Sequence, residues 1–95
     1  MAEKTKIAYQ GYVINDSKYL SDDDVIEYEF RNAGTTDCEI NGIFVGRKSS
    51  DFPFNYFKET ITENQKNGYR YRIKFLNSDP TKNFLIVIEK RIVYN

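Results

Sequence analysis

The stretch that most constrains this chain is residues 25–46, where short apolar runs flank the dipeptide Asn41-Gly42. A type I′ turn needs a positive φ at both central residues, and Asn followed by Gly meets this need better than most other pairs. We therefore expect a tight β-hairpin at Asn41 and Gly42. A single strand with a bulge at Gly42 is the alternative.

Residues 25–30 alternate between apolar and acidic side chains. Successive side chains of a strand point to opposite faces, so this pattern predicts a strand with one buried and one hydrated face. The residues expected on the buried face are Ile26, Tyr28 and Phe30. A polar loop follows at residues 32–37, where Gly34 can supply a positive φ. Cys38 is then expected to be buried beside Ile40 on the next strand.

Other segments also have strand patterns. Thr5–Ile14 predicts a first strand, and Gly11 within it indicates a bulge or a close backbone approach. Residues 83–94 form the longest strand pattern, and their first half is apolar on both faces, as in a central strand. The charged residues 89–91 then suggest that this strand runs out toward solvent. The polar segment 15–24 has room for one short helical turn.

Together these patterns predict about seven strands, with turn signals every 8–12 residues or so, as in sandwiches and small barrels. We expect an all-β fold: an antiparallel β-sandwich, immunoglobulin-like or jelly-roll-like. A chain of 95 residues has the size of one small domain, so the sandwich should span residues 1–95.

Composition argues against several classes of function. The chain has no His and one cysteine, Cys38, so it lacks the commonest general base, the commonest metal ligand and any intrachain disulfide. The consecutive carboxylates at 22–24 do not converge on one metal ion from an extended chain. No apolar run is long enough to span a bilayer. We therefore expect no enzyme activity, no cofactor and no membrane partner.

Basic residues are not in excess. The 14 basic residues equal the 14 acidic ones, which argues against a nucleic-acid partner. Residues 69–75 mix tyrosines with arginines, but strand alternation places the two kinds on opposite faces. Charge is nevertheless uneven along the chain, because residues 1–46 carry a net charge of −5 and residues 47–95 a net charge of +5. Either the strands of the two halves interleave, or the molecule is dipolar and docks by charge.

An aromatic cluster surrounds Pro53. Its members are Phe52, Phe54, Tyr56 and Phe57. Because Pro cannot donate to a β-ladder, residues 51–62 should form an edge strand or an ordered loop. Four aromatic residues exceed what one edge segment needs for a small core, and aromatic residues dominate binding hot spots. We interpret the cluster as a partner-binding site; closure of one end of the sandwich is the alternative.

The segment Phe30 to Ile43, FRNAGTTDCEINGI, resembles a pattern of small β-sandwich proteins from bacteriophage particles. In those proteins a strand ends in Asn-x-Gly, a Thr- and Asp-rich loop follows, and an Ile-Asn-Gly hairpin comes next. A Pro-Gly turn often follows their hairpin, whereas this chain has Gly46-Arg47-Lys48. The resemblance covers 14 of the 95 residues and carries no catalytic residue with it.

The resemblance implies a structural component of a bacteriophage virion, assembled in the host bacterial cytoplasm. A capsid auxiliary (decoration) protein and a tail or neck accessory both fit this expectation. Its partners would be other protein subunits of a large assembly, in which the chain is present in multiple copies. The alternative is a stand-alone β-sandwich binding module, such as a small inhibitor or a carbohydrate-binding domain.

Overall fold

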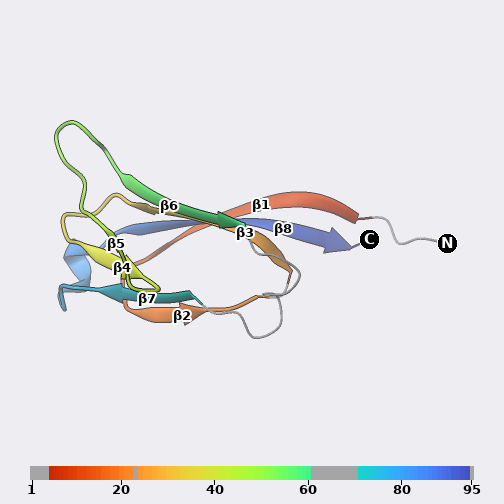
Figure 1. Cartoon of the computed structure of the whole chain (residues 1–95), viewed down its shortest axis with the longest axis horizontal. Coiled ribbons are helices and arrows are strands. Elements are labelled where there is room, and N and C mark those ends of the chain that lie inside the picture. The colour runs from red at the N-terminus through yellow and green to blue at the C-terminus, as the bar shows by residue number, and fades with distance from the viewer. Residues whose placement is uncertain (1–4, 23, 61–70, 95) are drawn as a thin grey trace.

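Two four-stranded antiparallel sheets pack face to face in the computed structural model (Figure 1). The structure describes residues 5–22, 24–60 and 71–94. The strands are β1 (Thr5–Ile14), β2 (Lys18–Leu20), β3 (Val25–Asn32), β4 (Cys38–Ile40), β5 (Ile43–Val45), β6 (Asn55–Thr60), β7 (Tyr71–Phe75) and β8 (Leu85–Tyr94). A short 3₁₀ helix, η2 (Pro80–Lys82), precedes β8. The predicted all-β sandwich is confirmed.

Sheet A has the strand order β1-β8-β3-β6, and sheet B has the order β2-β7-β4-β5. The eighth strand, beyond the seven expected, is β2. It lies within the polar segment 15–24, where we expected a short helical turn. Leu20 explains the difference, because its side chain is buried in the core and its backbone pairs with Tyr71 of β7.

The hairpin is confirmed. Asn41 has a φ of 52° and Gly42 a φ of 81°, and they join β4 to β5 with Ile40 paired to Ile43. Cys38 and Ile40 are both fully buried, as expected from their shared face. The side chain of Asn41 also accepts a hydrogen bond from the backbone N–H of Arg72, which fixes the turn to β7.

The start of β3 departs from the simple alternation of buried and exposed side chains. A β-bulge between Val25 and Glu27 changes the pairing with β8, so Val25 is fully buried and Ile26 only partly. A bulge adds one residue to one strand and moves the following side chains to the other face. Tyr28 and Phe30 are buried as predicted.

Two further expectations need correction. Gly11 marks neither a bulge nor a close approach, because β1 pairs with β8 without interruption from Thr5 to Ile14, and a Cβ at Gly11 would meet only the carbonyl O of Val87 at 3.8 Å. β8 leaves the core only after Glu89: residues 90–93 are partly exposed, whereas the Glu89 side chain is buried and accepts hydrogen bonds from Tyr12 Oη at 2.8 Å and from Arg91 at 2.9 Å. A carboxylate with two such donors can be buried at a tolerable cost.

The two oppositely charged halves of the chain interleave. In sheet A, β8 from the second half lies between β1 and β3 from the first. Ion pairs join the halves, with Asp22 2.8 Å from Arg91 and Glu27 3.4 Å from Lys58. The charge asymmetry of the sequence therefore does not separate into two halves of the molecule.

Candidate docking site

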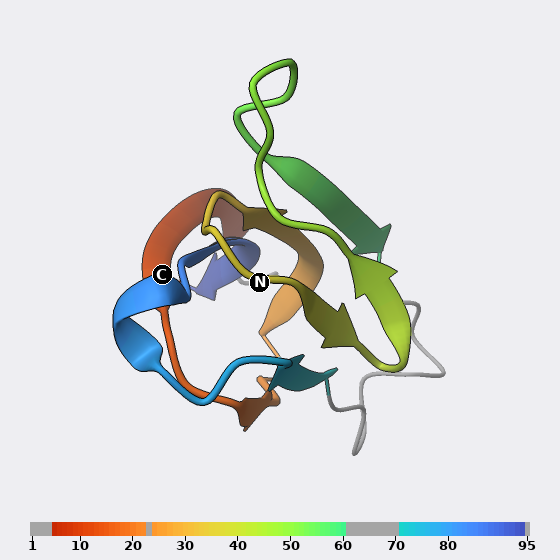
Figure 2. The same cartoon turned by 90° about the vertical axis from the view of Figure 1, so that its left-hand side faces the viewer.

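The segment between β5 and β6, residues 46–54, projects away from both sheets (Figures 1 and 2). We call it the β5–β6 loop. Its outermost turn is closed by two hydrogen bonds between the same two residues. Ser49 N–H donates to the carbonyl of Phe52 at 2.8 Å, and Phe52 N–H donates to Ser49 Oγ at 3.1 Å. The loop therefore has a defined backbone at its tip.

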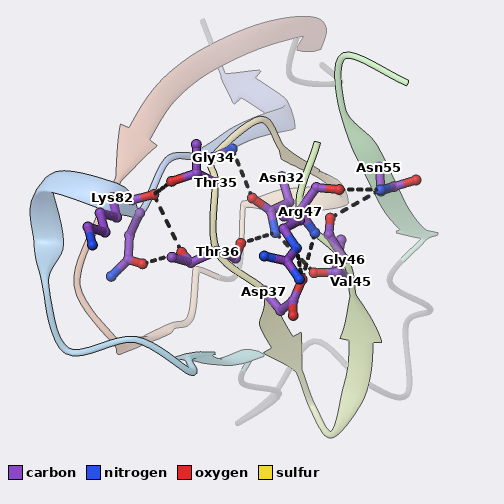
Figure 3. Close-up of polar contacts among 11 residues, drawn as sticks. Asn32, Gly34, Thr35, Thr36, Asp37, Val45, Gly46, Arg47, Asn55 and Lys82 are labelled. Atoms are coloured by element: carbon purple, nitrogen blue, oxygen red, sulfur yellow. Dashed lines mark hydrogen bonds and ion pairs between the residues drawn. The ribbon is translucent and has the colours of Figure 1, made fainter. Parts of the chain in front are cut away.

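The base of the loop is fixed by side-chain amides and carboxylates (Figure 3). The Asn55 amide donates to the carbonyls of Gly46 at 3.2 Å and Arg47 at 2.9 Å, which ties the start of β6 to the end of β5. Asp37 accepts a hydrogen bond from Arg47 N–H at 2.9 Å. The backbone on both sides of the loop is thus anchored to the sandwich.

A second layer of contacts lies behind this base. The fully buried Asn32 donates from its amide to the carbonyls of Thr36 at 2.9 Å and Val45 at 3.0 Å, and accepts from Gly34 N–H at 3.1 Å. Lys48 N–H in turn donates to the carbonyl of Gly34 at 3.0 Å. The Asn-x-Gly step therefore supports the loop. The Asn32-x-Gly34 spacing was the one feature of the sequence that could have indicated this support. The sequence alone could not show that these residues contact the loop, because the contacts join segments that are apart in sequence.

The structure places the four predicted aromatic residues differently. Phe52 is 61% exposed and Tyr56 is 66% exposed. Phe54 is partly buried, with the Arg31 guanidinium carbon 4.9 Å from its ring centre. Phe57 packs against the core and lies 6.2 Å from the Phe30 ring. Three members of the cluster are therefore at least partly exposed, and the fourth faces the core.

A shallow groove continues from the loop onto the outer face of sheet A. The residues that line it are Glu29, Arg31, Phe54, Tyr56 and Lys58. Arg31 donates to Glu29 on its own strand and lies opposite Tyr56 in the ladder, so its guanidinium is held over the aromatic surface. Cation–π contacts and paired charges favour one side-chain arrangement before a partner binds. Aromatic residues and arginine together are typical of interface hot spots.

The other candidate sites have structural roles. Burial, followed by the nearby charges of Asp37 and Glu39, raises the pKa of the Cys38 thiol to about 12, which keeps it protonated and unreactive near neutral pH. Within the described ranges, no group of three or more His, Cys, Asp or Glu residues can hold a metal ion. Asp22 pairs with Arg91, and Asp23 lies outside the described residues.

The basic and aromatic residues of 69–75 separate as expected. In the described part of that segment, Tyr71 and Ile73 are buried while Arg72 and Lys74 are exposed. Tyr69 and Arg70 lie outside the described residues. No helix in the described part of the chain has the length and apolar character needed to cross a bilayer.

Sequence reasoning missed a polar cluster around the buried Glu89. Glu89 joins Tyr12 and Arg91, and Arg91 also reaches Asp22. The buried Tyr28 hydroxyl has no hydrogen-bond partner among the described residues. Burial, followed by the charge of Glu89, raises the pKa of Tyr28 above its ordinary value. The charged triplet 89–91 gave no signal of this burial, which depends on pairing with β1 and β3.

No family model, curated protein or solved structure matches this chain.

Proposed function

We propose that this chain is a non-enzymatic structural component of a bacteriophage particle that docks onto other protein subunits through the β5–β6 loop. It would act as a capsid auxiliary protein or as a tail or neck accessory, in multiple copies. The observation that carries the proposal is the exposed Phe52 ring on a projecting loop whose tip and base are both hydrogen-bonded. A large exposed apolar ring on a fixed backbone is suited to insertion into a partner's pocket.

The anchoring of the loop supports docking for an energetic reason. Ordering a loop on binding reduces affinity, because conformational entropy is lost at that moment. Here Asn55, Asp37 and the Asn32–Gly34 step hold the base before any partner arrives. Most of the binding free energy from Phe52 and Tyr56 would therefore remain available for affinity.

The resemblance to phage particle proteins concerns these same supporting residues. Asn32-x-Gly34 lies under the loop, and Asn41-Gly42 forms the hairpin that leads into it. The shared pattern thus covers the scaffold of the proposed docking site. The exposed aromatic residues Phe52 and Tyr56 lie outside the resemblance, which fits a scaffold that presents different loops to different partners.

Mass spectrometry of density-gradient fractions from the native source tests the proposal. We expect the chain to band with phage particles at a fixed ratio to a capsid or tail protein. A chain that stays at the top of the gradient as a free small protein would contradict a structural role.

Variants test whether the loop is the docking element. Phe52→Ala combined with Tyr56→Ala should lower particle occupancy at least tenfold, while the unfolding midpoint stays close to that of the unmodified chain, because both rings are exposed. Phe57→Ala is the matched control: its ring packs on the core, so it should lower stability. Normal occupancy of the double variant would show that docking uses another surface.

A stand-alone binding module is the second candidate. It is favoured by three exposed tyrosines, which are residues suited to stacking on sugars: Tyr9, Tyr19 and Tyr56. They lie on three strands, β1, β2 and β6, and the first and last of these are opposite edges of sheet A. Tyr9 and Tyr56 share the outer face of sheet A but lie on its opposite edge strands, and Tyr19 belongs to sheet B, so docking through the loop is the first proposal. Glycan-array binding by a free monomer would favour the second.

A further inference from the structure

A second surface lies at the opposite edge of sheet A from the docking site. β1 is the outermost strand there and has no strand paired on its far side among the described residues. Figure 2 shows β1 and β6 on opposite sides of the sandwich. An open edge presents a row of backbone donors and acceptors that is a template for another strand.

The four sheet edges differ in how they are protected. β2 and β5 have three residues each, and β6 carries Lys58 and Glu59. Short edges and edge charges both discourage pairing with another chain. β1 is ten residues long, and its residues 7–14 contain no charge and no proline. Its ladder with β8 is also free of bulges. β1 therefore lacks the usual protection of an edge strand.

The outer face of β1 is apolar as well. Ile7 and Val13 are each 49% exposed, and Tyr9 is 67% exposed. They lie beside Ile92, Ile86 and Lys90 of β8, respectively. A strand added at this edge would therefore bury apolar side chains in addition to satisfying the backbone.

We propose that β1 pairs antiparallel with β1 of a second copy of this chain, joining two A sheets into one eight-stranded sheet. In a two-fold dimer that keeps both outer faces on the same side, each residue of one β1 lies opposite a residue of the other β1 that points to the same face. Side chains alternate between faces along a strand, so both residues of a pair are odd-numbered or both are even-numbered. Centring the axis on Gln10 places Tyr9 opposite Gly11, and Ile7 opposite Val13. The Tyr9 ring then covers the residue that has no side chain of its own.

Charge supports a second copy as the occupant. Lys6 lies near one end of β1, and Asp16 lies two residues beyond the other end. Neither takes part in an ion pair among the described residues. Antiparallel pairing about Gln10 brings Lys6 opposite Ile14 of the second copy, close to its Asp16. The pairing therefore joins opposite charges at both ends of the interface. The net charge of zero adds no general repulsion between copies.

Analytical ultracentrifugation of the full chain provides the first test. We expect a mass of twice 11.2 kDa for the unmodified protein. Ile7→Lys with Val13→Lys places like charges opposite each other and should halve the mass. The control, Tyr19→Lys with Phe44→Lys, adds the same charge at exposed positions on β2 and β5 and should leave the dimer intact. An unmodified chain that is monomeric at all concentrations would overturn the proposal, as would a dimer that dissociates only in the control.

Cysteine cross-linking tests the register and does not depend on dissociation. Paired Cα atoms of antiparallel strands lie about 4.5–5.5 Å apart, within the range that a disulfide spans. Gln10→Cys places one cysteine beside its own copy on the axis, so mild oxidation should yield a covalent dimer. Lys58→Cys on β6 is the matched control and should remain uncrosslinked; the native Cys38 is buried. Efficient cross-linking of the control but not of Gln10→Cys would refute pairing through β1.

Discussion

At the scale of single residues, Gly34 shows how a correct expectation about residue type can have the wrong cause. We expected a glycine at position 34 to supply a positive φ, yet among the described glycines it is Gly42 that has a positive φ. Gly34 is needed because of space: a Cβ there would lie 2.7 Å from the backbone N of Phe84 and 3.1 Å from the carbonyl O of Lys82. Backbone atoms cannot move aside as a side-chain tip can. This close approach between segments that are distant in sequence could not be predicted from the sequence alone.

Gly34→Ala should therefore lower the free energy of unfolding by about 1–3 kcal/mol, the usual range for inserting a methyl group into a tightly packed site. Urea denaturation monitored by tyrosine fluorescence measures the change. Gly11→Ala is the matched control, because its Cβ would meet only the carbonyl O of Val87 at 3.8 Å. It should be neutral or stabilise by about 0.5 kcal/mol. Equal losses in both variants would show that close approach is not the cause.

At the scale of secondary-structure elements, the sequence was most informative where residues adjacent in the chain determine the local structure. The Asn41-Gly42 turn and the central position of β8 follow from nearest-neighbour patterns, and both are correct. The bulge at the start of β3 and the burial of Glu89 were not predictable in this way. Both depend on pairing partners about 60–80 residues away in sequence, for which one sequence provides no register.

The same limit applies to the candidate docking site. The sequence located the aromatic cluster around Pro53, but it did not separate Phe57, which faces the core, from its exposed neighbour Tyr56. That separation depends on the ladder between β3 and β6, where Phe57 lies opposite the buried Phe30. A one-residue difference in register would have exchanged the two faces.

The anchoring of the β5–β6 loop predicts a change in protease sensitivity. Asn55→Ala removes two hydrogen bonds to the backbone of Gly46 and Arg47. Each bond contributes about 0.5–1.5 kcal/mol, so trypsin should cut the variant after Arg47 or Lys48 at least several-fold faster. The control Thr60→Ala, at the other end of β6, should be cut at the rate of the unmodified chain. Unchanged cleavage of Asn55→Ala would mean that other contacts hold the loop.

At the scale of the whole molecule, ion pairs between the two halves make stability depend on pH. Burial alone would raise the pKa of Asp22, but hydrogen bonds from Asp24 N–H and Arg91, and the charge of Arg91, outweigh it and lower that pKa overall. The folded pKa therefore lies below the unfolded value of about 3.9. The carboxylate stabilises the fold above that value, and its contribution is lost as the pH falls through the folded pKa.

Asp22→Asn should accordingly lower the melting temperature at pH 7 and have a progressively smaller effect below about pH 4. Thermal unfolding monitored by circular dichroism between neutral and acid pH measures this convergence. Asp51→Asn is a useful comparison, because Asp51 is exposed in the β5–β6 loop and takes part in no ion pair among the described residues. A constant difference between Asp22→Asn and the unmodified chain across the pH range would argue against the ion pair as the cause.

The interleaving of strands has a consequence for splitting the chain. Residues 1–46 contain β1 and β3 but not β8, the strand that lies between them; β8 belongs to residues 47–95. Neither piece can build sheet A alone, and their net charges of −5 and +5 attract each other. Expressed as separate polypeptides, the two fragments are therefore expected to fold only on meeting, so that each can report the presence of the other as a complementation pair.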